Sequence, residues 1–212
     1  TPVPWTPQAP HLYRAQVRLI HGGEVIDTVH TQFGMRDIDT GPLDEDEDAP
    51  RYIRLNGEPI YLRGALDQSF HPEGVYTHPT DEDIKRDFVL AKEVGLNFLR
   101  LHIKTPDPRY CYWADRVGVL LMCDMPGVGY DGYSETAKRR WERNAWGQIE
   151  RDFNHPSIFS WCLFNETWGL GGRQYADAPE RQEWVQQCWE RAKSLDPTRL
   201  VEDNSPCLND HV

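Results

Sequence analysis

Over most of its length the sequence alternates between short apolar runs of strand length and longer amphipathic stretches of helix length. The run Val119–Asp124 is almost continuously apolar, as parallel strands that are covered on both faces require. The ends of helices are also marked, as where Asp107 precedes Pro108 and where Gly118 follows the same amphipathic stretch. Repeated strand–helix units of this kind pack as a (β/α) barrel or as a doubly wound sheet.

We expect this α/β part to contain five strands and four helices, which is about half of an eight-stranded TIM barrel. No GxGxxG and no GxxxxGK[ST] motif follows any predicted strand, and this disfavours a nucleotide-binding fold. The sequence is therefore expected to end in the middle of the barrel. The predicted strands are 60–65, 97–102, 119–124, 157–164 and 199–203, and the predicted helices are 80–95, 107–118, 136–152 and 179–195.

The beginning of the chain has β character without helices. Tyr13–Ile20 and Glu24–Phe33 alternate between apolar and polar residues and flank a Gly22-Gly23 turn. Two strands are not stable on their own, so we expect them to be the last strands of a β-sandwich. A second hairpin is predicted around Asn56-Gly57, between strands 52–55 and 60–62.

These patterns divide the chain into a β-sandwich part (1–39), a linker (40–50) and the first half of the barrel (51–212). The linker contains the acidic run Asp44–Asp48. Because no spaced ligand pattern accompanies the run, we expect a solvated connector rather than a metal site.

Composition limits the partners of the protein. A net charge of −11 argues against nucleic acid, which binds clustered Lys and Arg, and no apolar run is long enough to cross a membrane.

The five cysteines have no CxxC spacing, so we expect free thiols, with one disulfide as the alternative, and this slightly favours the cytoplasm. The chain begins at Thr1 without a signal peptide, so we expect the true N-terminus to be missing. A homo-oligomer of the complete protein is left open.

Polar and ionisable residues follow nearly every predicted barrel strand. Reactive groups of (β/α) barrels lie at these carboxyl ends, so the sequence predicts an active site there. Eight Trp residues could add flat apolar faces for sugar rings, although core packing is the commoner role of any single Trp. The strand-end residues are Asp67, Gln68, Arg100, His102, Asp124, Asn165, Glu166, Asp203 and Asn204.

Glu166 stands out among them because Phe164 and Trp168 flank it in the sequence. An apolar wall disfavours the charged form of a carboxyl group, and a general acid needs such a raised pKa to protonate a leaving oxygen near neutral pH. The alternative is a carboxylate that caps a helix or forms an ion pair.

The context of Glu166 resembles the acid/base signature of glycoside hydrolase family 2. The resemblance rests on Asn154–Ile158, on Trp161 and on Phe164–Gly169. It extends over almost the whole chain, in the order in which the family has its motifs. Trp5, Pro7, Pro10, Leu12-Tyr13 and Phe33–Arg36 resemble the end of its immunoglobulin-like domain, and Leu55–Gly64, Ala91–Arg100 and Trp113–Gly118 resemble the first units of its barrel.

This resemblance implies a retaining β-glycoside hydrolase, like the β-galactosidases, β-glucuronidases and β-mannosidases of the family. Glu166 would be the general acid/base, and Asn165 would bind the 2-hydroxyl group of the sugar. The nucleophilic glutamate would lie beyond Val212, and no cofactor or metal is implied. Further substrate contacts are expected from Arg100, His102, Asp67, Asp124, Trp168 and Asn204.

Three departures from the family pattern leave the sugar unassigned. His102 falls one residue earlier than the usual Arg-x-Ser-His motif places its histidine, so a substrate contact and a packing role are both open. Asp124-Met125-Pro126 stands where Asp-Glu is common, and the loop 65–71 lacks the usual Asn-Arg-His pattern.

Other hypotheses also fit parts of the sequence. His102, Asp124, Asp203 and His211 could form a metal-dependent hydrolase, although no HxH or HExxH motif is present. A non-catalytic carbohydrate-binding or scaffold protein could use the family fold without its chemistry. The 212-residue chain expressed alone is expected to aggregate or to bind a complementing fragment, and to show no glycosidase turnover.

Overall fold

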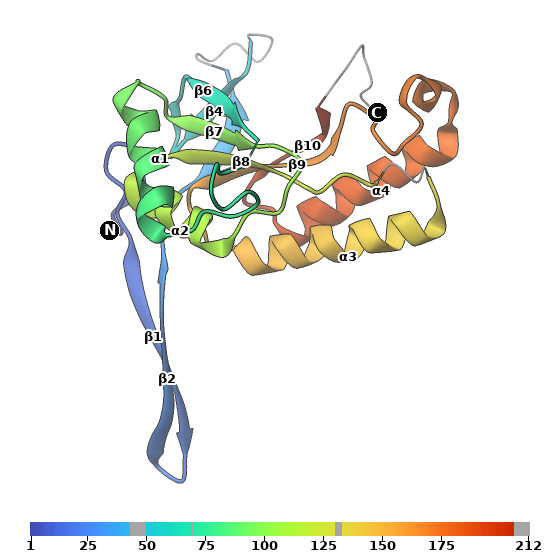
Figure 1. Ribbon diagram of the computed structural model, residues 1–212. Coiled ribbons are helices and arrows are strands. Elements are labelled where there is room, and N and C mark those ends of the chain that lie inside the picture. Colours follow the sequence, from blue (N-terminus) through green and yellow to red (C-terminus); the bar gives the residue numbers. More distant parts are fainter. Residues whose placement is uncertain (43–49, 69, 130–132, 206–212) are drawn as a thin grey trace.

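The computed structural model describes residues 1–42, 50–68, 70–129 and 133–205 (Figure 1). Its centre is a parallel sheet of five strands whose spatial order, β10-β9-β8-β7-β6, follows the order along the chain. A helix separates each strand from the next, so the predicted partial (β/α)8 barrel is confirmed. The strands are β6 (Gly64–Asp67), β7 (Phe98–Leu101), β8 (Leu120–Asp124), β9 (Ile158–Asn165) and β10 (Leu200–Ser205).

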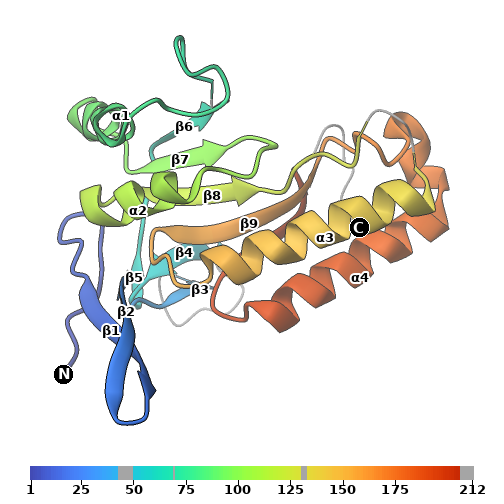
Figure 2. The same cartoon turned by 60° about the horizontal axis from the view of Figure 1, so that its bottom comes forward.

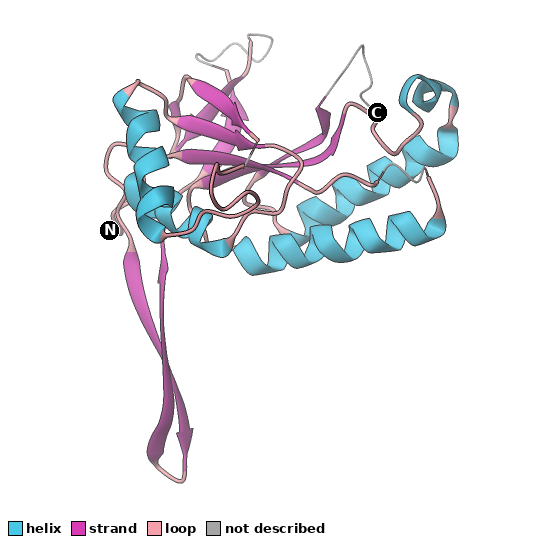
Figure 3. Cartoon of the chain, viewed as in Figure 1, coloured by secondary structure: helices cyan, strands magenta, loops and turns pink. Residues whose placement is uncertain are grey.

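Four α-helices and a short 3-10 helix complete the barrel part, and α3 and α4 lie side by side along the sheet (Figures 2 and 3). Their ends carry the capping residues that the sequence predicts. The Thr80 side chain accepts from the amide of Asp83 at 3.2 Å, and Gly118 ends α2 in the left-handed region at φ 83°. The helices are α1 (Asp81–Glu93), α2 (Pro108–Val117), α3 (Glu135–Asp152), α4 (Pro179–Leu195) and the 3-10 helix η1 (Gly172–Asp177).

Aromatic side chains fill the space between α3, α4 and the sheet. The Trp141 ring stacks on Phe164 with centroids 4.5 Å apart, and Trp184 packs against both. Trp161 is fully buried on β9, and its indole N–H donates to Asp196 at 2.9 Å. These tryptophans are core residues and not parts of a sugar-binding surface.

A three-stranded antiparallel sheet lies at the amino ends of the barrel strands. It packs Ile38 and Leu55 against Leu120 and Phe159, around the fully buried Trp5. Because this sheet covers the amino ends, the carboxyl ends are left for a site. Its strands are β3 (Ile38–Gly41), β4 (Tyr52–Leu55) and β5 (Glu58–Pro59).

The hairpin around Asn56-Gly57 is confirmed, but the predicted strand 60–62 is wrong. Asn56 and Gly57 have φ values of 55° and 85°, so they form a two-residue turn. Such a turn pairs its immediate neighbours, Leu55 and Glu58, and the second strand of the hairpin is therefore β5. The first barrel strand then begins only at Gly64.

The two amino-terminal strands, β1 (Tyr13–His21) and β2 (Glu24–Phe33), form a ribbon that projects from the body (Figure 1). The predicted Gly22-Gly23 turn joins them. Val17 and Val29 pair across the ribbon, and both are more than half exposed. An isolated ribbon with such apolar side chains is at most marginally stable, so these side chains need cover of the kind that a β-sandwich provides.

Three other predictions concern the linker, the state of the cysteines and the absence of a membrane-spanning segment. The boundary predicted between residues 39 and 40 falls within β3, and the acidic run of the linker lies outside the described residues. Cys207 also lies outside them, whereas the four described cysteines are buried and form no disulfide with one another. None of the described helices has the length and apolar character that a bilayer crossing requires. The four are Cys111, Cys123, Cys162 and Cys188.

Candidate active site

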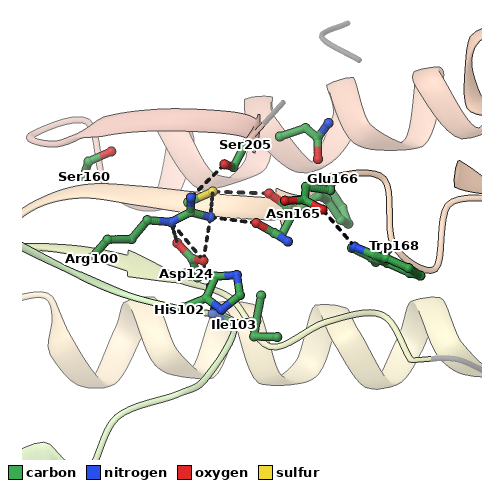
Figure 4. A network of polar contacts seen from close by, with 12 residues as sticks. Arg100, His102, Ile103, Asp124, Ser160, Asn165, Glu166, Trp168 and Ser205 are labelled. Carbon is green, nitrogen blue, oxygen red and sulfur yellow. Dashed lines mark hydrogen bonds and ion pairs between the residues drawn. The ribbon is translucent and has the colours of Figure 1, made fainter. Parts of the chain in front are cut away.

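The guanidinium group of Arg100 joins four neighbouring strands at the carboxyl ends of the sheet (Figure 4). It donates to the Asp124 carboxylate on β8 at 2.8 to 3.2 Å, through Nε and Nη2. Nη2 also donates to Asn165 Oδ1 on β9 at 2.9 Å, and Nη1 donates to Ser205 Oγ on β10 at 2.7 Å. Residues that are far apart in the sequence are thus held in one polar network.

Asp124 is the buried anion of this network, with a side chain that is 2% exposed. Burial disfavours the charged form of Arg100, but hydrogen bonds to and attraction by Asp124 outweigh it and hold the pKa of Arg100 above its usual value. The amide of Ile103 adds a third donor to the carboxylate, at 3.1 Å. Ile103 has φ 46°, which is unfavourable for a β-branched residue, so the network is formed at a strained turn.

A second strained turn follows β9. Glu166 and Thr167 have φ values of 52° and 57°, in the left-handed region that residues other than glycine rarely occupy. The turn is closed by Trp168, whose amide donates to the Asn165 carbonyl at 3.0 Å. The Glu166 amide donates across to the Ser205 carbonyl of β10 at 2.9 Å. This backbone path takes the Glu166 side chain out of the strand and toward the opening of the barrel part.

The Glu166 carboxylate is exposed, and its Oε2 accepts from the indole N–H of Trp168 at 3.2 Å (Figure 4). Of the two flanking aromatic residues, Trp168 contacts the carboxylate directly, whereas the Phe164 ring stacks on Trp141 and lines the same cavity as Glu166. Burial is weaker than the sequence neighbours suggest. Among the described side chains no cation forms an ion pair with Glu166, which disfavours the structural alternative.

Glu166 lines a cavity of about 420 Å³ at this end of the sheet. The volume is within the range of small-molecule sites. The wall contains one carboxylate among the described residues, an exposed indole and a short glycine-containing segment. The lining residues are His102, Ile103, Met125, Gly127, Val128, Gly129, Leu163, Phe164, Asn165, Glu166 and Trp168.

His102 faces this cavity. It directly follows Leu101, the last residue of β7, and lines the cavity together with Ile103. A 2.9 Å hydrogen bond joins its Nδ1 to Gln68 Oε1 in the segment after β6. The early position of His102 in the sequence thus still leads to the cavity, and not to the helix layer.

Two other predicted residues point elsewhere. The Asp67 carboxylate accepts a hydrogen bond from the Tyr110 hydroxyl in the helix layer, where burial and this carboxylate raise the pKa of Tyr110. Asn204 is fully buried, and its Oδ1 accepts from the Thr167 amide at 3.2 Å. Neither lines the cavity.

Comparison with known proteins identifies the family. Residues 49–211 match the TIM barrel domain of the glycosyl hydrolases family 2, and residues 1–36 match a further domain of the same family. The chain belongs to glycoside hydrolase family 2.

The family 2 chain is 31% identical to a putative beta-glucuronidase of Formosa agariphila and 30% identical to a beta-galactosidase of Photobacterium profundum. These alignments cover 92% and 95% of this chain but only 17% and 18% of the relatives. The apo structure of beta-glucuronidase 3 from Bacteroides uniformis matches with a TM-score of 0.77 and 29% identity, over 94% of this chain and 24% of that one. The chain thus spans less than a fifth of the length of these curated relatives.

The metal-site alternative fits this family 2 chain poorly. Within the described residues no group of three His, Cys, Asp or Glu side chains lies close enough to hold a metal ion. Asp124 is bonded to Arg100, and His102 is bonded to Gln68. His211, the fourth proposed ligand, lies outside the described residues.

Two members of the network, Ser205 and the amide of Ile103, were not predicted from the sequence. Ser205 could have been found, because it directly follows Asn204 at the end of a predicted strand. The amide of Ile103 has no signal in the sequence, since its role depends on a backbone conformation that local preferences disfavour.

Proposed function

We propose that the complete protein is a retaining β-glycoside hydrolase and that this chain supplies its general acid/base, Glu166. The observation that carries the proposal is the strained turn after β9, which holds Glu166 at the cavity beside an asparagine fixed by Arg100. Membership of family 2 and the two curated relatives support a carbohydrate substrate.

In the first half of the reaction, the Glu166 carboxylic acid donates its proton to the glycosidic oxygen while a second carboxylate attacks the anomeric carbon. In the second half, the Glu166 carboxylate takes a proton from water, which then releases the sugar from the covalent intermediate. The indole N–H of Trp168 donates to Oε2 of Glu166 and so helps to orient the carboxyl group.

The nucleophile must lie ~5 Å from Glu166 for retention. Asp124 does not fit this role, because its side chain is 2% exposed and its oxygens are bonded to Arg100. We propose that the nucleophile belongs to a strand outside the described residues, on the open side of the sheet.

Asn165 is proposed to bind the 2-hydroxyl group of the sugar. Its Oδ1 accepts from Arg100, which fixes the orientation of the amide and leaves Nδ2 to donate to a substrate oxygen. A hydrogen bond to the 2-hydroxyl strengthens as the ring approaches the oxocarbenium-like transition state. Arg100 and Asp124 then act by holding Asn165 in place.

Trp168 and His102 are proposed to contact the sugar or the leaving group from two sides of the cavity. The Trp168 side chain is 58% exposed and offers a flat face, on which the apolar face of a pyranose ring can stack. The His102 ring offers a nitrogen for a hydroxyl group.

The test is the substitution Glu166→Gln in the complete protein, assayed on aryl β-glycosides of graded leaving-group ability. We expect a loss of about 10²- to 10⁴-fold on poor leaving groups, because they need the proton, and a much smaller loss on activated ones. Azide should restore turnover on the activated substrates and yield a β-glycosyl azide, since it attacks the intermediate without help from a base.

The matched control is Glu150→Gln, which changes an exposed glutamate of α3 outside the cavity. This variant should retain normal turnover on both kinds of substrate. Equal losses on poor and activated leaving groups in Glu166→Gln would contradict the acid/base assignment. Sugar binding without any turnover in the unmodified protein would favour the non-catalytic alternative.

A further inference from the structure

The end of β10 holds the acid/base turn through two hydrogen bonds. The Ser205 carbonyl accepts from the Glu166 amide at 2.9 Å, and the Asn204 side chain accepts from the Thr167 amide at 3.2 Å. Glu166 and Thr167 are the two consecutive residues of the turn that have left-handed backbone conformations. Strained conformations of this kind persist only where the surroundings hold them.

The two hydrogen bonds differ in how they can be removed. The bond to Ser205 uses a main-chain carbonyl, so no substitution abolishes the acceptor. The bond to Asn204 uses a side chain that is 0% exposed, and Thr167 is only 1% exposed. Without Asn204, water has little access to satisfy the buried amide of Thr167, and the turn must rearrange to find another acceptor.

Such a rearrangement would act directly on Glu166. Within the described part of the chain, the carboxylate accepts from the indole N–H of Trp168, and Trp168 belongs to the same turn. A shift of the turn therefore moves the carboxylate and its indole partner together. The Arg100–Asp124 pair itself should move less, since its two residues belong to β7 and β8.

We propose that Asn204 is a positioning residue for the general acid/base, and not a substrate contact. This inference rests on the proposed function of Glu166. Asn204 holds the Thr167 amide, so that the strained turn keeps the Glu166 carboxyl at the distance from the glycosidic oxygen that proton transfer requires. Its effect should therefore appear only in steps that need proton transfer by Glu166.

The test is Asn204→Ala in the complete protein, measured on the same graded aryl β-glycosides. A misplaced acid should lower kcat on poor leaving groups by about 10- to 100-fold. On activated leaving groups the loss should stay below about threefold, and KM should change little, because binding does not involve Asn204. Asn204→Asp keeps an oxygen acceptor for Thr167 and should recover most of the kcat on poor leaving groups.

Asn97→Ala is a matched control at the opposite end of the sheet. Asn97 is also buried, and its Oδ1 also accepts from a backbone amide, that of Arg63, at 2.8 Å. Its loss should lower the thermal stability of the protein but leave the dependence on the leaving group unchanged. A purely structural role of Asn204 would produce this same pattern.

A double substitution separates the two hypotheses. When Glu166 is already Gln, the Asn204→Ala change should cause no further loss on poor leaving groups, because both changes affect the same step. Losses that multiply, or equal losses of Asn204→Ala on all leaving groups, would overturn the positioning role while leaving the acid/base assignment intact. If Glu166→Gln alone shows no dependence on the leaving group, the proposed function itself fails.

Discussion

Replacement of Arg100 by Met should destabilise the protein strongly, because it leaves a buried charge without its partner. The Asp124 side chain is 2% exposed, and the guanidinium supplies hydrogen bonds of 2.8, 3.0 and 3.2 Å to it. After the substitution, the donor that remains to the Asp124 carboxylate among the described residues is the Ile103 amide, at 3.1 Å. Breaking one partner of a buried ion pair costs about 3–5 kcal/mol.

A second substitution should restore part of this loss. Asp124→Asn removes the unpaired charge but keeps an oxygen that can accept from the Ile103 amide. We therefore expect Arg100→Met with Asp124→Asn to be more stable than Arg100→Met alone by about 2 kcal/mol. Activity should not return, because Asn165 still lacks the donor that orients it.

The assay is urea unfolding of the complete protein, followed by the fluorescence of the barrel tryptophans. Arg54→Met is the matched control, because the Arg54–Asp39 contact of 2.6 Å is shorter than the 2.8 Å contact of Arg100 with Asp124, but its side chains are 31% and 41% exposed. Removing this exposed pair should cost far less than removing Arg100, because solvent screens the attraction between its charges. A loss in Arg100→Met no larger than in the control, or no recovery with Asp124→Asn, would refute the reasoning.

Further predictions concern the stability of the barrel part. Asp196→Ala breaks a pair with Arg199 at 2.6 Å between side chains that are 0% and 2% exposed, and urea unfolding should show a loss of about 3–5 kcal/mol. Burial alone would raise the pKa of Asp196, but Arg199 and hydrogen bonds lower it. The contribution of Asp196 to the free energy of unfolding is therefore complete above the unfolded pKa of about 3.9, and it is lost as the pH falls through the lower folded pKa. In acid, the variant should consequently lose less stability than the native protein. Gly118→Ala should lower the thermal midpoint, because φ is +83° and the added Cβ would meet the Pro7 carbonyl oxygen at 2.4 Å. The control is Gly147→Ala in α3, where the added Cβ meets nothing within 4 Å, and this variant should gain up to about 1 kcal/mol in the free energy of unfolding.

The helices were predictable from the sequence because their signals are local. Thr80, Asp107 and Gly118 act on backbone groups within a few residues, so the ends of α1 and α2 follow from the residues themselves. The order of the strands also followed, since helical crossovers between parallel strands allow few topologies. The strand error at 60–62 arose where a two-residue turn, rather than the apolar pattern, determined the pairing.

Glu166 was proposed from its own motif, and the five predicted strands placed it at the carboxyl edge of the sheet. The sequence thus determined the family, the barrel order and the residue that we propose as the acid/base. It did not determine where each strand-end side chain points, because this depends on contacts between distant segments. Only the tertiary structure turned Asp67 toward Tyr110, placed Arg100 between Asp124 and Asn165, and buried Asn204 beneath the acid/base turn, since each of these bonds joins residues 24 to 65 positions apart.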